Sequence, residues 1–289
     1  MSPGRRFPGA ALVAVLLCAG TGVTAPPALA SPAHSPAHPA ATAAGTSYYV
    51  DPNGSDTADG RTPATAWRSL AKVDAQTLLP GDTVRFRAGG RWSGQLSPRG
   101  SGTAADPVVL TSYGSGAKPL IEGGGIVDAA IRISDEHDIV VAGFEVTNSG
   151  SGTTPRIGIG VGATDMGAVT GVVVRDNQVH AIQGASSGSQ ASNPSAGGII
   201  VSARGERTPT YYENLAIEDN EVYDTRSYGI VTWCSGCSGR AGTPCGPTSW
   251  ASRPPTSGPG RRAPGWSYGA TPCTTSRRAA SRSCRRAAR

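Results

Sequence analysis

The chain has 289 residues, of which 40 are glycine and 16% are charged, and its formal net charge is +6. The positive sum comes from residues 239–289, which carry ten arginines and no acidic residue, whereas residues 1–238 carry 16 basic and 20 acidic residues. A positive total would otherwise favour nucleic-acid binding. Because the chain ahead of the tail is mildly acidic, composition argues against nucleic acid as a partner.

Residues 1–30 have the three parts of a secretory signal peptide. Two early arginines supply the positive region, and residues 10–19 form an apolar core that is too short to span a bilayer. Residues 28–30, Ala-Leu-Ala, then offer a small-residue cleavage site. Residues 31–46 form a low-complexity spacer. We therefore expect a secreted protein without a membrane anchor after signal cleavage.

The next region, residues 47–125, is predicted to close one end of the fold. Residues 47–51 alternate as a short strand. Residues 67–79 place apolar side chains at helical spacing, and Pro80-Gly81 ends that helix. Since a stack of repeats needs its open end covered, we expect this N-terminal helix and strand to form a cap.

Residues 126–238 contain a repeated sequence. Residues 172–180 (VVVRDNQVH) recur as residues 215–223 (LAIEDNEVY), and a looser copy lies at residues 139–147 (IVVAGFEVT). Aligned on their last valine, the copies are 33 and then 43 residues apart. Self-similarity at this period is typical of stacked repeats. The copies lie on short predicted strands that direct alternate aliphatic residues toward a core.

A parallel β-helix accounts for these features best. In that solenoid each coil contributes short strands to long parallel sheets, and equivalent residues of successive coils stack about 4.8 Å apart. Loops of different length explain the uneven spacing of the copies. We expect such loops at residues 147–155, 184–196 and 203–213. The predicted fold is all-β over residues 47–238, with the cap over 47–125 and the coils over 126–238.

Short segments near the start of this region carry a family resemblance. They are Tyr49–Asp56, Asp59-Gly60, Thr65–Leu70, Leu79–Val84 and Ile121–Gly124. These segments resemble the start of secreted bacterial right-handed β-helix proteins, a superfamily that includes pectate-lyase-like enzymes. The resemblance covers residues 47–238 and implies a right-handed winding. It also implies polysaccharide lyases or glycoside hydrolases as the commonest activities, although no catalytic motif matches residue by residue.

Stacking the two close copies pairs polar residues of neighbouring coils. Asn177 lies beside Asn220, which predicts a hydrogen-bonded ladder at a corner of the coil. Asp176 lies beside Asp219, and two adjacent carboxylates repel unless a cation lies between them or both point into water. Ca²⁺, which prefers oxygen ligands, is therefore the candidate cofactor, with solvated turn residues as the alternative.

His180 and Asp224 are the candidate catalytic residues. Asp224 follows Tyr223, the stacked neighbour of His180, and the pair could act as a base and its orienting carboxylate. The alternative is an exposed histidine at the end of a strand. A lyase needs such a base and a cation near the substrate carboxylate, whereas a hydrolase needs two carboxylates at a defined separation. Basic and aromatic loop residues are candidates for substrate binding: Arg204, Arg207, Tyr211, Tyr212, Arg226 and Trp233.

Residues 239–289 differ abruptly in composition from the rest. They contain no Val, Ile, Leu, Met or Phe and are rich in Arg, Pro, Gly and Ser. The change falls within a repeat, just after the Cys234–Cys237 pair, which we expect to form a local disulfide or free thiols. A GC-rich gene read out of frame explains the tail, with a disordered basic extension as the alternative. We therefore expect a β-helix truncated by a frameshift.

Together these features predict an exported, monomeric, carbohydrate-active β-helix protein. Its expected partner is an acidic or plant-type polysaccharide, which it cleaves as a lyase or hydrolase, or binds. The alternatives are a non-catalytic extracellular or cell-wall interaction module and an inactive truncated gene product.

Overall fold

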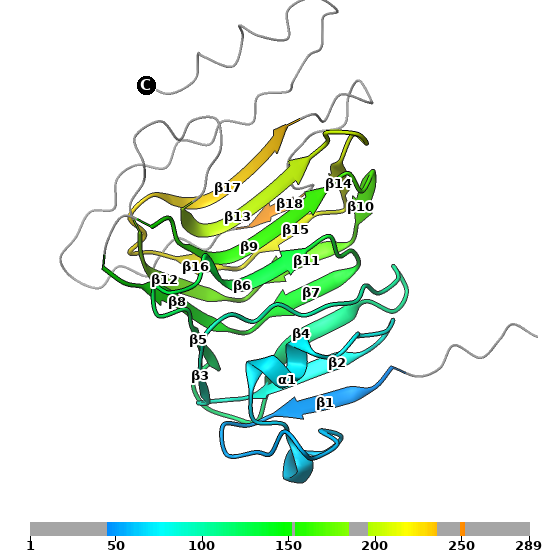
Figure 1. The fold of residues 1–289 in the computed structure, drawn as a ribbon, viewed down its shortest axis with the longest axis vertical. Coiled ribbons are helices and arrows are strands. Elements are labelled where there is room, and N and C mark those ends of the chain that lie inside the picture. Colours follow the sequence, from blue (N-terminus) through cyan, green and yellow to red (C-terminus); the bar gives the residue numbers. More distant parts are fainter. Residues whose placement is uncertain (1–44, 152–153, 185–195, 236–248, 252–289) are drawn as a thin grey trace, which may run out of the picture. The chain divides into compact units, whose positions relative to one another are not determined.

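A computed structural model describes residues 45–151, 154–184, 196–235 and 249–251 (Figure 1). The chain divides into two compact units, residues 1–42 and 43–289, and all described residues belong to the second. The predicted signal peptide therefore lies outside the described residues. Within these ranges no helix has the length and apolar character needed to cross a membrane.

Almost every described element is a β-strand, and all strand pairs are parallel. The seven-stranded sheet has the order β1 (Ser47–Val50), β2 (Thr83–Arg87), β4 (Val108–Tyr113), β7 (Ile139–Ala142), β11 (Val172–Arg175), β15 (Ala216–Glu218) and β18 (Ser249–Ala251). The five-stranded sheet has the order β16 (Glu221–Val222), β12 (Gln178–Gln183), β8 (Glu145–Ser149), β5 (Leu120–Glu122) and β3 (Arg91–Ser93).

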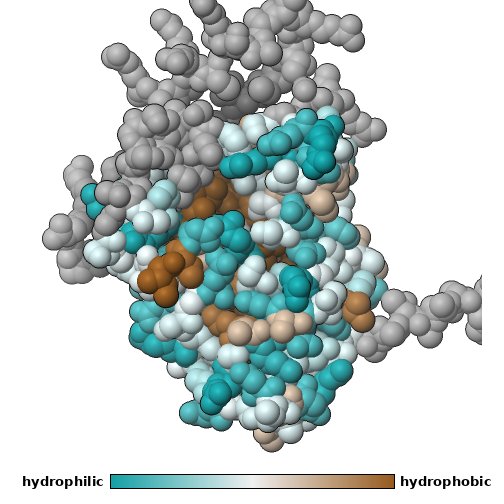
Figure 2. Space-filling model, viewed as in Figure 1, coloured by the Kyte–Doolittle hydropathy of each residue, from teal (hydrophilic) through white to brown (hydrophobic). Residues whose placement is uncertain are grey.

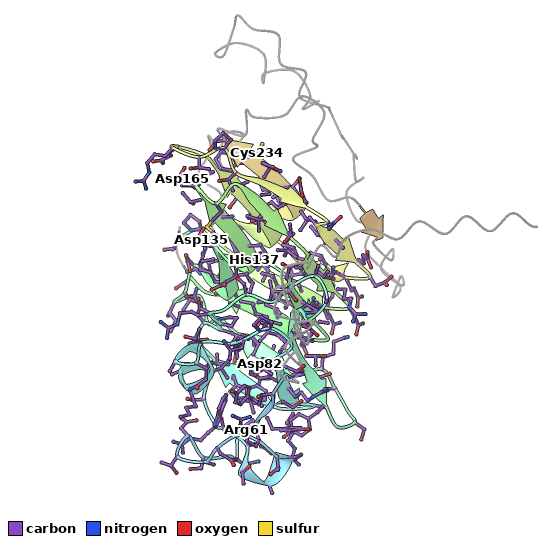
Figure 3. All side chains as sticks on the ribbon, turned by 90° about the vertical axis from the view of Figure 1, so that its right-hand side faces the viewer. Arg61, Asp82, Asp135, His137, Asp165 and Cys234 are labelled. Atoms are coloured by element: carbon purple, nitrogen blue, oxygen red, sulfur yellow. The ribbon has the colours of Figure 1, made fainter. Side chains whose placement is uncertain are left out.

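Two smaller sheets contribute to some of the coils. The four-stranded sheet has the order β17 (Tyr228–Ser235), β13 (Gly197–Arg204), β9 (Ile157–Thr164) and β6 (Ala129–Ser134). A two-stranded sheet pairs β10 (Ala168–Thr170) with β14 (Tyr211–Glu213). The chain visits the sheets in turn and returns to the first one coil further along, so that the coils rise in chain order from Arg61 to Cys234 (Figure 3). This winding is a parallel β-helix.

The register confirms that the three copies of the repeat stack. Val179 pairs with Val146 on one side and with Val222 on the other. All three valines belong to one continuous hydrophobic core, together with the inward aliphatic residues of the other sheets. Since fully burying one such side chain contributes about 1.5 to 3 kcal/mol, the alternation of the repeat is what holds successive coils together.

The N-terminal helix is shorter than the sequence predicts. Helix α1 (Leu70–Asp74) begins after Ser69, whose hydroxyl accepts the backbone N–H of Lys72 at 3.1 Å. The predicted range 67–79 is too long because its ends pair with neighbouring backbone: Trp67 bridges Val50, and residue 78 donates to residue 99. A short 3₁₀ helix, η1 (Pro63–Thr65), precedes it. The capping role of α1 stays a prediction.

The arginine-rich tail contains one described strand. β18 pairs with β15 and extends the seven-stranded sheet within residues 239–289. The other residues of the tail, together with Cys237, lie outside the described ranges. The frameshift and the fate of the cysteine pair therefore stay predictions.

Candidate functional site

The corner between the seven- and five-stranded sheets holds the asparagine ladder that the repeat predicts. Asn177 and Asn220 are 1% and 2% exposed, and Asn177 Nδ2 donates to Asn220 Oδ1 at 3.0 Å. Asn177 also donates to Val141 O at 3.0 Å and accepts the backbone N–H of Phe144 at 3.0 Å. The Asn220 amide donates in the same way to Val174 O at 2.8 Å. Because buried polar groups need partners, this prediction is confirmed as a structural corner.

Beyond this corner, the outer face of the five-stranded sheet carries polar residues on successive coils. One row contains Glu145, Gln178 and Glu221, which the register places side by side. The next outward row contains Thr147 and His180. The valine between the two rows points inward on each coil, so the polar side chains share one face. We call this surface the outer polar face.

His180 contacts residues of both neighbouring coils. Its Nε2 lies 2.9 Å from Glu145 Oε1, and the two side chains are 21% and 27% exposed. Its ring stacks on that of Tyr223, with centroids 4.9 Å apart and an interplanar angle of 1°. The predicted stack of His180 and Tyr223 is thus confirmed, and the contacts with Glu145 and Tyr223 together fix the orientation of the imidazole.

Gln178 links the remaining members of the outer polar face. Its amide Nε2 donates to Glu221 Oε2 at 3.3 Å and to the Tyr223 hydroxyl at 3.2 Å. Burial, followed by the negative charges of Glu221 and Glu145, raises the pKa of Tyr223. The phenol therefore stays a hydrogen-bond donor at neutral pH. The face combines two carboxylates, an imidazole, an amide and a phenol on three coils.

The sequence prediction paired His180 with Asp224, but the structure pairs it with Glu145. Asp224 Oδ1 instead accepts a hydrogen bond from Gln183 Nε2 at 2.8 Å. The reason is geometric: Asp224 follows Tyr223 into a left-handed turn, with φ of 47°, which takes its side chain out of the row of the histidine. Glu145, Gln178 and Glu221 were missed, although aligning the looser repeat copy places Glu145 beside Gln178.

The candidate metal ligands Asp176 and Asp219 occupy left-handed turn positions, with φ of 53° and 50°. Asp176 Oδ1 forms an ion pair with Lys118 Nζ at 2.9 Å, and its side chain is 67% exposed. In the part of the chain that the structure describes, no group of three or more His, Cys, Asp or Glu side chains could hold a metal ion. Lys118 is therefore the cation that accompanies Asp176 in this structure.

The candidate substrate-binding residues are distributed over several sheets. Arg204, at the end of β13, places its guanidinium 5.5 Å from the ring centroid of Trp233 on the outside of the four-stranded sheet. Tyr212 lies in the core at 5% exposure and donates to Ser202 O at 3.1 Å; burial raises its pKa. Tyr211, half-buried, pairs along β10, and Arg226 is exposed near the end of β12. Only Arg226 comes from the loop that follows the outer polar face.

The remaining candidate, Arg207, anchors a loop. Its Nε lies 3.3 Å from Asp165 Oδ2, while Asp165 Oδ1 accepts the backbone N–H groups of residues 206, 207 and 208 at 2.8, 2.7 and 2.9 Å. These contacts, chiefly the backbone N–H groups of Thr208 and Arg207, lower the pKa of Asp165 to about 2. Asp135, one coil away, accepts the N–H of Thr164 in a similar turn (Figure 3).

Comparison with known proteins supports the fold. No family model matches the sequence. A stretch of 140 residues is 29% identical to the uncharacterized protein YwoF of Bacillus subtilis (strain 168), covering 47% of this chain and 29% of that protein. The chain thus spans less than a third of this curated relative.

Solved structures with a similar fold include two of a GH136 lacto-N-biosidase from Eubacterium ramulus. The selenomethionine derivative has a TM-score of 0.60 and 23% identity and covers 69% of this chain and 38% of that chain. The native protein has a TM-score of 0.58 and 23% identity, with 66% and 36% covered. The chain is a parallel β-helix protein. At this identity the likeness concerns the β-helix alone, and the site residues rest on the geometry described above.

Proposed function

We propose that this protein is an exported glycoside hydrolase that cleaves a polysaccharide along the outer polar face. The observation that carries the proposal is the placement of Glu145 and Glu221 on either side of Gln178. Two strand spacings put their backbones about 9 to 10 Å apart. Inverting glycosidases use two carboxyl groups roughly 6.5 to 9.5 Å apart, which leaves room for the attacking water.

The partners of the two glutamates suggest different roles. Glu145 shares a hydrogen bond with His180, so we assign the general acid to this pair: Glu145 gives its proton to the leaving oxygen, and a proton from solvent returns to Glu145 through His180. Glu221 accepts the amide of Gln178, which orients its carboxylate on the face, and we assign to it the activation of water. Tyr223 holds His180 in place by stacking.

The charge of this face favours a neutral polysaccharide over an acidic one. Arg91, a cation of the same sheet, already pairs with Glu122 at 3.1 Å. A uronate chain would meet the carboxylates of Glu145 and Glu221, and like charges at this distance repel. Hydrolysis of a neutral glycan therefore fits the face better than elimination on a uronate. On the side of the molecule that Figure 2 shows, hydrophilic residues predominate and apolar residues gather in separate patches.

The similar fold of a lacto-N-biosidase supports carbohydrate as the substrate class. This chain covers only 38% of the lacto-N-biosidase chain. We therefore infer the substrate from the outer polar face and not from the substrate of that enzyme. Export follows from the predicted signal peptide. N-terminal sequencing of the protein recovered from culture medium should begin near Ser31; recovery in the cell with an intact Met1 would contradict export.

The test compares the full-length protein with Glu145→Gln and Glu221→Gln on neutral polysaccharides (xylan, arabinogalactan, mixed-linkage glucan) and acidic ones (pectate, alginate). We expect new reducing ends from a neutral polymer and at least about a hundredfold loss of rate in either variant. Arg85→Gln, on the outside of the seven-stranded sheet, is the matched control and should keep full activity. Ultraviolet-absorbing unsaturated ends would indicate a lyase, and affinity without products a binding module; either result would overturn the proposal.

A further inference from the structure

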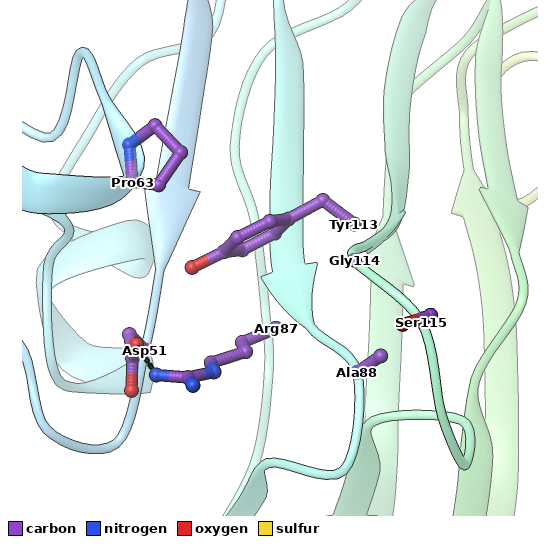
Figure 4. A pocket seen from close by; sticks show the side chains of 7 residues that line it. All are labelled: Asp51, Pro63, Arg87, Ala88, Tyr113, Gly114 and Ser115. Atoms are coloured by element: carbon purple, nitrogen blue, oxygen red, sulfur yellow. Dashed lines mark hydrogen bonds and ion pairs between the residues drawn. The ribbon is translucent and has the colours of Figure 1, made fainter.

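A pocket of about 430 Å³ lies at the carboxyl ends of β1, β2 and β4 (Figure 4). Its volume falls within the range of roughly 300 to 1,000 Å³ that is usual for small-molecule sites. Asp51, Arg87 and Tyr113 supply its functional groups, and Pro63, Ala88, Gly114 and Ser115 complete its wall. None of these residues belongs to the proposed cleavage machinery.

Three neighbouring strands bring these side chains together. Arg87 and Tyr113 are paired in register at the ends of β2 and β4, and Asp51 directly follows β1. Because the strands are parallel, their carboxyl ends meet at the same edge of the sheet. The ring of Tyr113 meets Tyr49 edge-on at 5.1 Å, which fixes its position across the pocket.

The polar groups of the pocket retain hydrogen-bonding capacity. Arg87 Nη1 donates to Asp51 Oδ2 at 2.6 Å, and the side chains of Arg87 and Asp51 are 54% and 10% exposed. Asp51 Oδ1 accepts one further bond, from the N–H of Asn53 at 2.9 Å. A guanidinium has five donors and a carboxylate about four acceptor positions, so both can bind more partners. Burial and the charge of Asp51 raise the pKa of Tyr113, whose hydroxyl remains protonated.

We propose that this pocket binds one uncharged sugar unit, held by Arg87, Asp51 and Tyr113. The ion pair leaves the pocket without net charge, so an anionic ligand would face the carboxylate and a cationic one the guanidinium. Adjacent hydroxyls of a sugar act as both donors and acceptors, which matches a guanidinium beside a carboxylate. The Tyr113 ring and Pro63 offer apolar surface to the sugar carbons. The proposal does not rest on the hydrolase assignment, because it requires binding alone.

The test is isothermal titration calorimetry on the full-length protein. The probes are methyl β-galactoside and methyl β-glucoside as neutral sugars, and glucuronate and inorganic phosphate as anions. We expect a Kd for a neutral glycoside on the order of millimolar. Affinity should fall about tenfold or more in Arg87→Gln and about threefold to tenfold in Tyr113→Phe, which removes one hydroxyl. Thermal melting checks the fold of each variant.

Arg132→Gln is the matched control, because Arg132 also pairs with an aspartate, Asp128, but lies on the four-stranded sheet. Its affinity for the glycoside should equal that of the wild type. If Arg87→Gln does not fold, Tyr113→Phe decides. Tighter binding of either anion, unchanged affinity in the pocket variants or no binding of any probe would overturn the proposal. Cleavage assays with Glu145→Gln report separately on the hydrolase assignment.

Discussion

Between two copies of the repeat, the buried positions carry the same or similar residues, whereas several outward positions carry different ones. Residues 174–180 and 217–223 share their asparagine at the corner and their valine in the core. The outward positions between them differ: Gln178 faces Glu221, and His180 faces Tyr223. The shared asparagine satisfies buried hydrogen bonds, the shared valine fills the core and the shared aspartate forms a left-handed turn, whereas the unlike residues create a polar face with several chemistries. The repeat therefore specifies the solenoid, and departures from it mark the candidate site.

The largest effect is expected at the buried corner. Asn177→Ala leaves the N–H of Phe144 and the C=O of Val141 without this side-chain partner, and the Asn220 amide oxygen keeps only the backbone N–H of residue 177. Since each buried unsatisfied group costs about 1 to 3 kcal/mol, we expect a loss of about 3 kcal/mol or more in unfolding free energy. Chemical denaturation measures it. Arg175 is exposed two residues earlier, and Arg175→Ala should change the unfolding free energy by less than about 0.5 kcal/mol. Equal losses in the two variants would show that the asparagine corner contributes no more to stability than an exposed position.

An exchange of outward residues tests function without disturbing the core. The double variant His180→Tyr with Tyr223→His keeps the ring stack but removes the imidazole from Glu145. We expect stability to change by less than about 1 kcal/mol and the rate of glycan cleavage to fall about a hundredfold. The matched exchange Arg175→Glu with Glu218→Arg should retain activity. Full activity in the first exchange would remove His180 from the proposed mechanism.

A smaller effect is expected at the turn before the corner. Asp176 has a left-handed backbone and an exposed ion pair with Lys118. Asp176→Ala should cost about 1 to 2 kcal/mol, mainly because alanine tolerates this conformation poorly, whereas Asp176→Asn should be nearly neutral. Thermal unfolding of both variants, with and without CaCl₂, measures this. Stabilisation of the wild type by Ca²⁺ that Asp176→Asn abolishes would instead support the metal site.

The smallest effect is local and depends on pH. Asp165 has a pKa lowered from 3.8 to about 2 because it accepts the N–H groups of the 206–208 loop. A carboxylate with a lowered pKa stabilises the fold fully above its unfolded pKa and loses that effect as pH falls toward 2. Hydrogen exchange of the 206–208 amides should therefore stay slow at neutral pH and become fast in Asp165→Ala. If these amides remain protected from exchange in the variant, contacts other than those with Asp165 hold the loop.

Much of the fold could be predicted from local patterns. The strands around Val146, Val179 and Val222, and the pairing of Asn177 with Asn220, follow from a repeat whose alternate residues are aliphatic. The helix was predicted at the correct place but too long, because periodicity does not reveal that Trp67 pairs with Val50. The stack of His180 on Tyr223 was also predictable, since it joins identical positions of two copies.

The partners of the site residues could not be predicted in the same way. Glu145 lies 35 residues before His180, in a copy that has Gly-Phe where the others have Asp-Asn. Similarly, Tyr212 is an aromatic residue in a loop by sequence, yet its side chain enters the core. Asp51, Arg87 and Tyr113 belong to no repeat, and only their register brings them to one pocket.

The sequence by itself determined the class of fold and which residues point inward, because a two-residue period and a recurring asparagine act through neighbours along the chain and through identical positions one coil away. The tertiary structure decided which unlike side chains meet on the outside. Those contacts depend on the register between successive coils, which brings Glu145 to His180. They also depend on the left-handed turn at Asp224, which carries the side chain of Asp224 away from His180.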